Sequence, residues 1–127
     1  MPSPPIAPSI SEVAEQTGLT LATLRYYERA GLMLAPIRRG SSTHREYSEE
    51  DVTWIVFLAK LRSTALPIAR IRDYVLLARQ GDVSSADRLE LLQRHRIAVV
   101  AQLESMSMSL DAIDYKISLY SERLSPA

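Results

Sequence analysis

The chain has 127 residues, which suits one domain of ordinary size but not two full domains with a separate effector domain. It contains no cysteine, so disulfides and thiolate metal or redox sites are excluded. Its two histidines, His44 and His95, lie far apart in the sequence, and a zinc or copper site is therefore not expected. Fifteen basic and fifteen acidic residues give a formal net charge of zero, which by itself does not predict a nucleic-acid partner.

The charges are divided unevenly along the chain. Residues 1–80 contain ten Lys or Arg and eight Asp or Glu, whereas residues 81–127 contain five and seven. Affinity for phosphate depends on the charge of a local patch rather than on the total charge. The excess of basic residues in the N-terminal part therefore favours contact of that part with an acidic partner. The difference is too small to identify a DNA-binding protein without further signals.

The sequence predicts neither a membrane protein nor an enzyme. It has no apolar run long enough to cross a bilayer and no basic-then-apolar N-terminus of a secretory signal, so we expect a soluble cytoplasmic protein. It also has no phosphate-binding loop, no metal-ligand cluster and no nucleophile with a base beside it. Neither an enzyme nor a cofactor is therefore expected.

The first predicted helix follows a proline-rich start. Residues 1–8 contain four of the seven prolines and are expected to form a flexible or extended lead. Ser9 stands three residues before Glu12, the spacing of a capping box, which predicts a helix from about Ile10. Gly18 suits the left-handed residue that ends such a helix.

A second short helix is predicted directly afterwards. Thr20 is a suitable N-cap, the helix runs from Leu21 to about Ala30, and Gly31 closes it. Two short helices joined by a tight turn that contains glycine form a helix-turn-helix.

Residues 32–47 are predicted to form a small two-stranded hairpin, or wing. Pro36 and the Gly-Ser-Ser sequence at 40–42 interrupt helix formation, and glycine and serine suit the tip of a hairpin. Three basic side chains flank this tip: Arg38, Arg39 and Arg45.

Two further helices are predicted after the wing. Ser48 caps the first, with carboxylates at 49–51 in its first turn, where they favour the positive end of the helix dipole. The expected core face of this helix comprises Trp54, Ile55, Phe57, Leu58 and Leu61. Pro67 opens the next helix at a position that tolerates proline, and Gly81 ends it. The expected core face of that helix comprises Ile68, Ile71, Val75 and Leu76.

Residues 84–124 contain neither glycine nor proline and are predicted to form one long helix. Apolar residues recur in it at alternating spacings of three and four, which is typical of a coiled coil. About forty residues at roughly 1.5 Å each extend on the order of 60 Å, more than the preceding head can cover. A second copy related by a two-fold axis is the simplest partner. The repeat comprises Leu89, Leu92, Arg96, Val99, Leu103, Met106, Leu110, Ile113, Ile117, Tyr120 and Leu124.

Some side chains of this helix allow two interpretations. Arg96 interrupts the apolar repeat, where it either fixes the register of the coiled coil or extends its charge to the edge. Met106 and Met108 are interpreted as packing residues rather than as parts of an effector site.

A string of short motifs resembles the MerR family of bacterial transcription regulators. The second helix reads Thr-Leu-Arg-Tyr-Tyr-Glu at 23–28 and is followed by Gly-Leu at 31–32. The wing ends in Arg-Glu-Tyr at 45–47, directly before Ser-Glu-Glu-Asp at 48–51. The resemblance runs in order over residues 10–77, and the long last helix fits it as well.

The resemblance implies a mainly α fold in which a winged helix-turn-helix head with a second helix pair occupies residues 9–81. It also implies an antiparallel coiled coil between two protomers over residues 84–124. Such homodimers bind an inverted repeat in double-stranded promoter DNA whose two polymerase-recognition elements are spaced too widely. They distort the duplex, so that RNA polymerase is affected indirectly through the DNA.

The residues that the resemblance implies in DNA binding come from the second helix and the wing. Thr20 and Thr23 could donate to phosphates, and Thr20 also serves as an N-cap. Arg25 either reaches phosphate or pairs with Glu28 on the same helix. Arg45 is favoured as a backbone contact over a solvated arginine, and Tyr27 is expected to pack under the wing. The full set is Thr20, Ala22, Thr23, Arg25, Tyr26, Arg38, Arg39, His44 and Arg45.

The sequence departs from the family pattern at three positions. Relatives often carry a basic residue where Ala22 stands, which puts base-specific contact there in doubt. His44 replaces a tyrosine of the wing but retains a donor for phosphate, which is stronger when protonated. Pro67 lacks the hydroxyl and the amide that relatives use in a second wing, so that grip is expected to be weaker.

Two hypotheses remain for what the protein responds to and what it does. A small organic effector could lie between the fourth helix and the coiled coil, near Tyr74, Leu77 and Trp54, although core packing explains these residues better.

The alternative function is a coiled-coil protein–protein interaction module with weak or no specific DNA binding. The zero net charge and Ala22 favour it, and the ordered motifs argue against it. A steep loss of affinity with salt would distinguish a DNA-binding protein from such a module.

Overall fold

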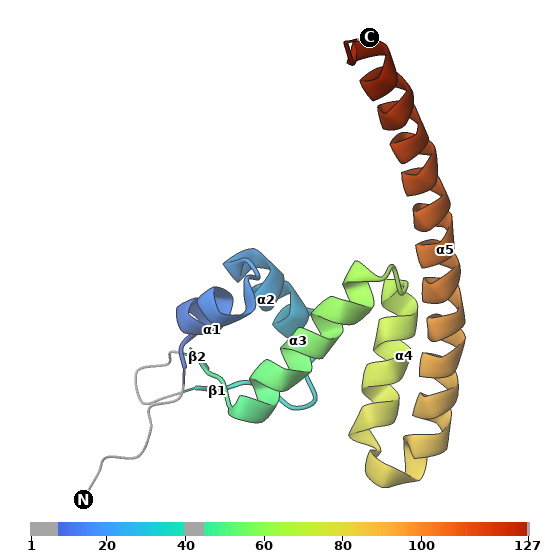
Figure 1. The fold of residues 1–127 in the computed structure, drawn as a ribbon. Coiled ribbons are helices and arrows are strands. Elements are labelled where there is room, and N and C mark those ends of the chain that lie inside the picture. Colours follow the sequence, from blue (N-terminus) through green and yellow to red (C-terminus); the bar gives the residue numbers. More distant parts are fainter. Residues whose placement is uncertain (1–7, 40–44, 127) are drawn as a thin grey trace, which may run out of the picture. The chain divides into compact units, whose positions relative to one another are not determined.

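The computed structural model describes residues 8–39 and 45–126. These residues belong to two compact units, divided between Arg88 and Leu89 along the chain (Figure 1). No helix in the described part of the chain is both long enough and apolar enough to span a bilayer. In chain order the elements are α1 (Ile10–Thr17), α2 (Leu21–Arg29), β1 (Arg38–Arg39), β2 (Arg45–Glu46), α3 (Glu49–Ser63), α4 (Ile68–Arg79), the 3₁₀ helix η1 (Gly81–Ser84) and α5 (Ser85–Leu124).

The predicted helix-turn-helix is confirmed, with the expected caps. The Ser9 hydroxyl accepts the Glu12 amide at 3.3 Å and begins α1. Gly18 ends it at φ 73°, in the left-handed region, and donates its N–H to the carbonyl of Ala14. Two residues later Thr20 caps α2, so the turn is closed by local hydrogen bonds at both ends.

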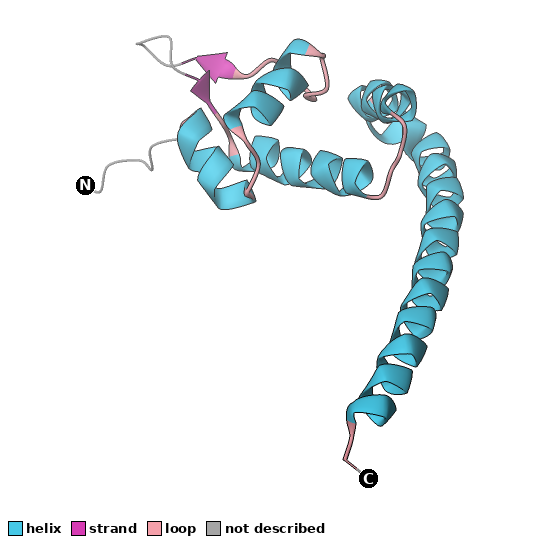
Figure 2. Ribbon diagram, turned by 90° about the horizontal axis from the view of Figure 1, so that it is seen from above, coloured by secondary structure: helices cyan, strands magenta, loops and turns pink. Residues whose placement is uncertain are grey.

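The predicted hairpin is also confirmed where the structure describes it. Strands β1 and β2 pair antiparallel, with Arg38 opposite Glu46 and Arg39 opposite Arg45. Figure 2 shows the two short strands at one edge of the helical head. The expected tip at 40–44, which includes His44, lies outside the described residues.

The core of the first unit lies where α1 packs on α2 and α3, and where α3 packs on α4. A capping box begins α3, because the Ser48 hydroxyl accepts the Asp51 amide while the Asp51 carboxylate accepts the Ser48 amide. Burial of the apolar side chains between these helices supplies most of the free energy that stabilises the head. The most fully buried are Val13, Leu24, Tyr27, Leu32, Tyr47, Ile55, Leu58, Ile71 and Val75.

The expected core face of α4 is wrong at one position. Leu76 is 57% exposed, whereas Tyr74, which was not assigned to this face, is 8% exposed. The reason is helical geometry: residue 76 is rotated by about 100° from residue 75, away from the face that carries Ile71 and Val75. Tyr74 stacks on Trp54 at 5.7 Å between ring centroids and therefore joins α4 to α3. Pro67 is the N-cap of α4, one position before the helix begins.

Residues 30–37, here called the connector, join α2 to the hairpin without regular structure. Three consecutive carbonyl oxygens of the connector nevertheless have donors from distant helices. Arg79 Nη2 donates to Gly31 at 2.8 Å and to Met33 at 2.5 Å, and Trp54 Nε1 donates to Leu32 at 2.7 Å. The α3 and α4 helices thereby fix the path of the chain between α2 and the hairpin.

A second set of hydrogen bonds holds the corner after α4. Ser84 is 1% exposed, and its hydroxyl is shared between the carbonyls of Leu77 and Gly81. Arg88 donates to the Ser84 hydroxyl at 3.0 Å and to the Gly81 carbonyl at 2.9 Å. A buried hydroxyl with partners on both sides fixes the turn from α4 into the start of α5.

The predicted long helix is confirmed as α5, which spans 40 residues, and none of them is buried. The side chains expected to form an apolar repeat are largely exposed to solvent: Leu103 is 64% exposed, Met106 70%, Ile113 57% and Ile117 56%. An apolar stripe of this length is unusual on a monomeric protein.

We predict that Trp54→Phe lowers the free energy of unfolding by about 1–2 kcal/mol, because it keeps a large ring but removes the donor to the part-buried Leu32 carbonyl. Denaturant titration at fixed protein concentration measures the change. The matched control is Ser63→Ala, which removes an exposed side-chain bond to a carbonyl of the same helix and should change stability by less than about 0.5 kcal/mol. Equal stability of Trp54→Phe and the wild type would contradict the assigned role.

Candidate nucleic-acid interface

Helix α2 buries one face and exposes the other. Leu24 and Tyr27, three residues apart, are both 2% exposed and fix the helix in the head. Ala22, Arg25 and Arg29 lie on the solvent side. The predicted DNA-facing residues of this helix therefore lie largely away from the core, which any contact with a large partner requires.

The N-terminus of α2 carries two linked hydroxyl groups. The Thr20 hydroxyl accepts the Thr23 amide at 3.1 Å and donates to the Thr23 hydroxyl at 2.9 Å. The N-cap role of Thr20 is thus confirmed. Because the Thr23 oxygen accepts this bond, its own hydrogen is available to an external acceptor. A helix N-terminus with a hydroxyl donor beside it suits an anion such as a phosphate.

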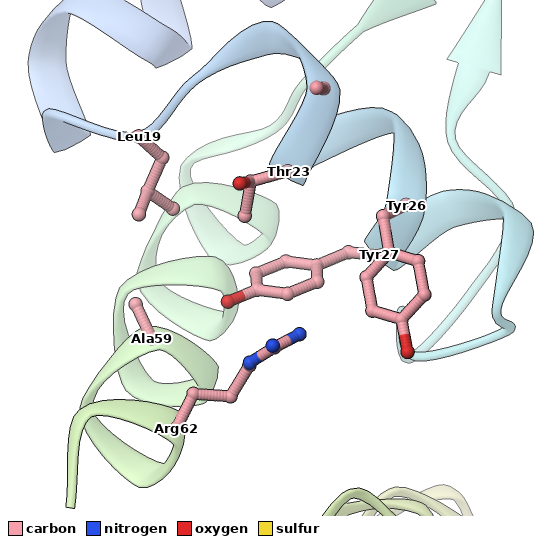
Figure 3. Close-up of a pocket in the computed structure, with 7 residues that line it drawn as sticks. Leu19, Thr23, Tyr26, Tyr27, Ala59 and Arg62 are labelled. Carbon is pink, nitrogen blue, oxygen red and sulfur yellow. The ribbon is translucent and has the colours of Figure 1, made fainter.

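An arginine of α3 joins this surface. The Arg62 guanidinium carbon lies 5.5 Å from the centroid of the Tyr26 ring, within the range of a cation–π contact. Figure 3 shows Arg62 extending from α3 toward the two tyrosines of α2. Together they border a pocket of about 490 Å³, which is lined by Leu19, Ala22, Thr23, Tyr26, Tyr27, Ala59 and Arg62.

Tyr27 is part of the framework of this pocket. Its ring points from α2 toward Ala59 and Arg62 of α3 (Figure 3). Burial raises the pKa of Tyr27 above its ordinary value of 10.0, while the positive charge of Arg62 acts in the opposite direction. The phenol is therefore neutral at physiological pH, and Arg62 remains a cation without a phenolate partner.

The hairpin is tied to α2 by an ion pair. Arg39 Nη2 of β1 lies 3.3 Å from the Glu28 carboxylate at the end of α2, so a partner of Glu28 is on the wing. Arg38, the neighbouring residue of β1, is exposed. Arg45 is placed in β2 opposite Arg39. The ion pair therefore joins the end of α2 to strand β1, where Arg38 is exposed beside it.

Arg62 is the residue of this surface that the sequence did not indicate. A basic residue in the last turn of a helix is common because it favours the negative end of the helix dipole, so its position in α3 carries no distinct signal. Only the packing of the head brings it beside Thr23 and Tyr26.

The aromatic residues near the suggested effector position pack as core. Trp54 and Tyr74 are stacked with an interplanar angle of 15°, and Phe57 lies 5.6 Å from Tyr74. With the Trp54 N–H bound to the connector, these rings join α3 to α4. Within the described part of the chain, no three His, Cys, Asp or Glu side chains are grouped as a metal ion would require.

The head of the chain matches a known protein family. Residues 9–77 match the family described as MerR HTH family regulatory protein. The HTH-type transcriptional regulator AdhR of Bacillus subtilis is 43% identical over 88 residues, which make up 69% of this chain. The match spans 62% of the length of AdhR, less than two thirds.

Solved structures extend the similarity to most of the chain. HiNmlR, a MerR family regulator lacking the sensor domain and bound to promoter DNA, has a TM-score of 0.85 and 25% identity. The similarity covers 91% of this chain and 87% of HiNmlR. A MerR family transcriptional regulator from Bacillus thuringiensis has a TM-score of 0.81 and 26% identity, with 91% of this chain and all of the other covered.

Proposed function

This chain belongs to the MerR family of helix-turn-helix transcription regulators, and we propose that it binds an inverted repeat in double-stranded promoter DNA as a homodimer. Binding distorts the duplex and thereby affects RNA polymerase indirectly, and the protein has no enzymatic activity of its own. The observation that carries the proposal is the exposed side of α2, with Arg62 beside Thr23 and Tyr26. Its support is the similarity of the fold to HiNmlR, which is bound to promoter DNA.

On this proposal the head grips the sugar-phosphate backbone at two places. The first comprises the N-terminus of α2 with Thr20 and Thr23, the exposed Arg25, and Arg62 above Tyr26. The second is the wing, where arginines supply the charge. Helix termini, hydroxyls and guanidinium groups are the usual donors to phosphate oxygens. The wing residues of the proposed interface are Arg38, Arg39, His44 and Arg45.

Ala22 lies among these residues with a methyl side chain. It can contact the methyl group of a thymine but cannot form a hydrogen bond with a base edge. The head therefore holds more donors suited to phosphate than to bases. Affinity should depend strongly on salt, and part of the specificity should come from the ease with which the sequence between the half-sites is deformed.

The dimer rests on α5. The apolar repeat of this helix is exposed in the single chain, and none of its 40 residues is buried. Each buried leucine or isoleucine side chain contributes roughly 1.5–3 kcal/mol relative to an exposed one. The occupant we propose is a second copy, since one repeat running the length of α5 is complementary to the same repeat in an antiparallel partner.

We predict that selection from a random pool of DNA duplexes at near-physiological salt enriches an inverted repeat with one fixed spacing. A two-fold dimer presents two identical heads, so the half-sites must be related by the same symmetry. Sequencing of the bound fraction measures the enrichment. A folded, dimeric protein that enriches no sequence would instead support the coiled-coil interaction module.

We predict that Arg62→Gln weakens operator binding about equally for matched and mismatched sequences, because a phosphate contact carries no base information. The slope of log affinity against log salt should fall by about one per head. Fluorescence anisotropy at several salt concentrations measures both. Arg94→Gln is the control, since it removes the same charge from an exposed i,i+4 ion pair of α5. An unchanged slope for Arg62→Gln, or an equal loss for Arg94→Gln, would refute the role of Arg62.

We predict that Ile113→Glu weakens dimerisation by roughly 10²–10⁴-fold, because in a two-fold dimer each substitution removes apolar burial twice and places two charges in the seam. Sedimentation equilibrium measures it against a chain mass of 14.2 kDa. Ser118→Glu adds the same charge outside the repeat and should leave the dimer intact. A dimer of unchanged affinity in Ile113→Glu would place the interface elsewhere.

A further inference from the structure

A second pocket lies against the connector, the segment that joins α2 to the wing. It has a volume of about 650 Å³ and is lined by Glu28, Gly31, residues 33–37, Arg39 and Arg79. This volume lies within the range of about 300–1,000 Å³ that is usual for small-molecule sites. None of the residues assigned to the DNA-facing part of α2 lines it.

The walls of this pocket are mostly apolar. Met33 and Ile37 are 5% and 8% exposed and belong to the core, whereas Leu34 is 39% exposed and stands at the rim. Ala35 and Pro36 are exposed beside it. A compact apolar body can therefore be covered here without moving the buried residues.

The charged residues that line the pocket favour a ligand with one negative charge. Arg39 is 3.3 Å from the Glu28 carboxylate, so these two charges largely offset each other. Arg79 binds only carbonyl oxygens, and no carboxylate among the described residues forms an ion pair with it. One net positive charge is thus left at the pocket, held in place by two hydrogen bonds to the connector.

Arg79 also keeps donors for a ligand. Both of its bonds to the connector come from Nη2. A guanidinium group has five N–H donors, so Nε and Nη1 keep three for an external acceptor. A ligand bound there leaves the contacts of Nη2 with Gly31 and Met33 in place.

We propose that this pocket binds a small organic monoanion, a carboxylate with a compact aromatic or aliphatic body, whose charge is bound by Arg79 and whose body packs on residues 33–37. A dianion fits less well because the Glu28 carboxylate lies in the same pocket. The site rests on the proposed function only in that its ligand would serve as the effector. The pocket lies on the segment that joins α2 to the wing. Ligand binding there would change the affinity for DNA, and DNA would change the affinity for the ligand by the same factor.

The test is a two-dimensional ¹⁵N–¹H NMR titration of the full chain with benzoate, with benzyl alcohol as the neutral control of equal shape. Benzoate should shift the amides of Gly31 and of residues 33–35 and 37 saturably, with at least about tenfold higher affinity than the alcohol. Arg79→Gln should weaken benzoate binding by about tenfold or more. Arg72→Gln removes the same charge from the exposed side of α4 and should not change it.

Ala35→Trp provides a second variant that keeps the bonds of Arg79 to the connector. It fills the pocket from an exposed position, so the fold should persist and benzoate binding should be lost. Equal binding of benzoate and benzyl alcohol, unchanged binding in Arg79→Gln or Ala35→Trp, or the absence of saturable shifts would overturn the site. Because the titration uses no DNA, binding of benzoate by a protein that selects no operator would refute the regulator and not the pocket.

Discussion

The geometry of the head depends on three carbonyl groups of the connector. Gly31, Leu32 and Met33 follow one another in an irregular segment, so their carbonyl oxygens lack the backbone hydrogen bonds of a helix or sheet. Arg79 and Trp54 supply them from α4 and α3. The bonds to Leu32 and Met33 are part-buried, and a part-buried carbonyl without a donor is costly, so these bonds favour one path for the chain. The orientation of the wing relative to α2 follows from that path and is reinforced by the Glu28–Arg39 ion pair.

The two units of the chain differ in how far their apolar side chains are buried. In the first unit, side chains such as Val13, Leu58 and Ile71 are almost fully buried within one chain. In α5 no residue is buried, although the helix carries a long apolar repeat. A single chain therefore buries the apolar side chains of the first unit and leaves those of α5 exposed. Dimerisation through α5 would complete its burial and would also fix two heads to one another, as a two-fold operator demands.

The sequence predicted what is determined locally. The caps at Ser9, Thr20 and Ser48 follow from side chains that bond amides three residues away, and the long helix follows from its periodicity and its lack of glycine and proline. Interactions between distant segments could not be read in this way. The contacts of Arg62 with Tyr26 and of Arg79 with the connector join residues 36 or more positions apart, and neither arginine differs from a solvated one in its local sequence. The assignment of Leu76 to the core failed for a different reason: it followed hydrophobicity alone, although residue 76 is rotated by about 100° from residue 75, away from the buried face.

The zero net charge of the chain is compatible with DNA binding because the head needs charge only at a few points. Glu28 offsets Arg39, whereas Arg62 lies against aromatic rings and keeps its full charge toward solvent. A head that binds phosphates through a small number of fixed donors, with Ala22 in the first turn of α2, gains little from reading base edges. In the proposed dimer, specificity would then arise from the DNA sequences on which both heads can reach phosphates at once. That condition would select DNA by its shape and deformability, and a ligand bound at the connector would change it by moving the wing against α2.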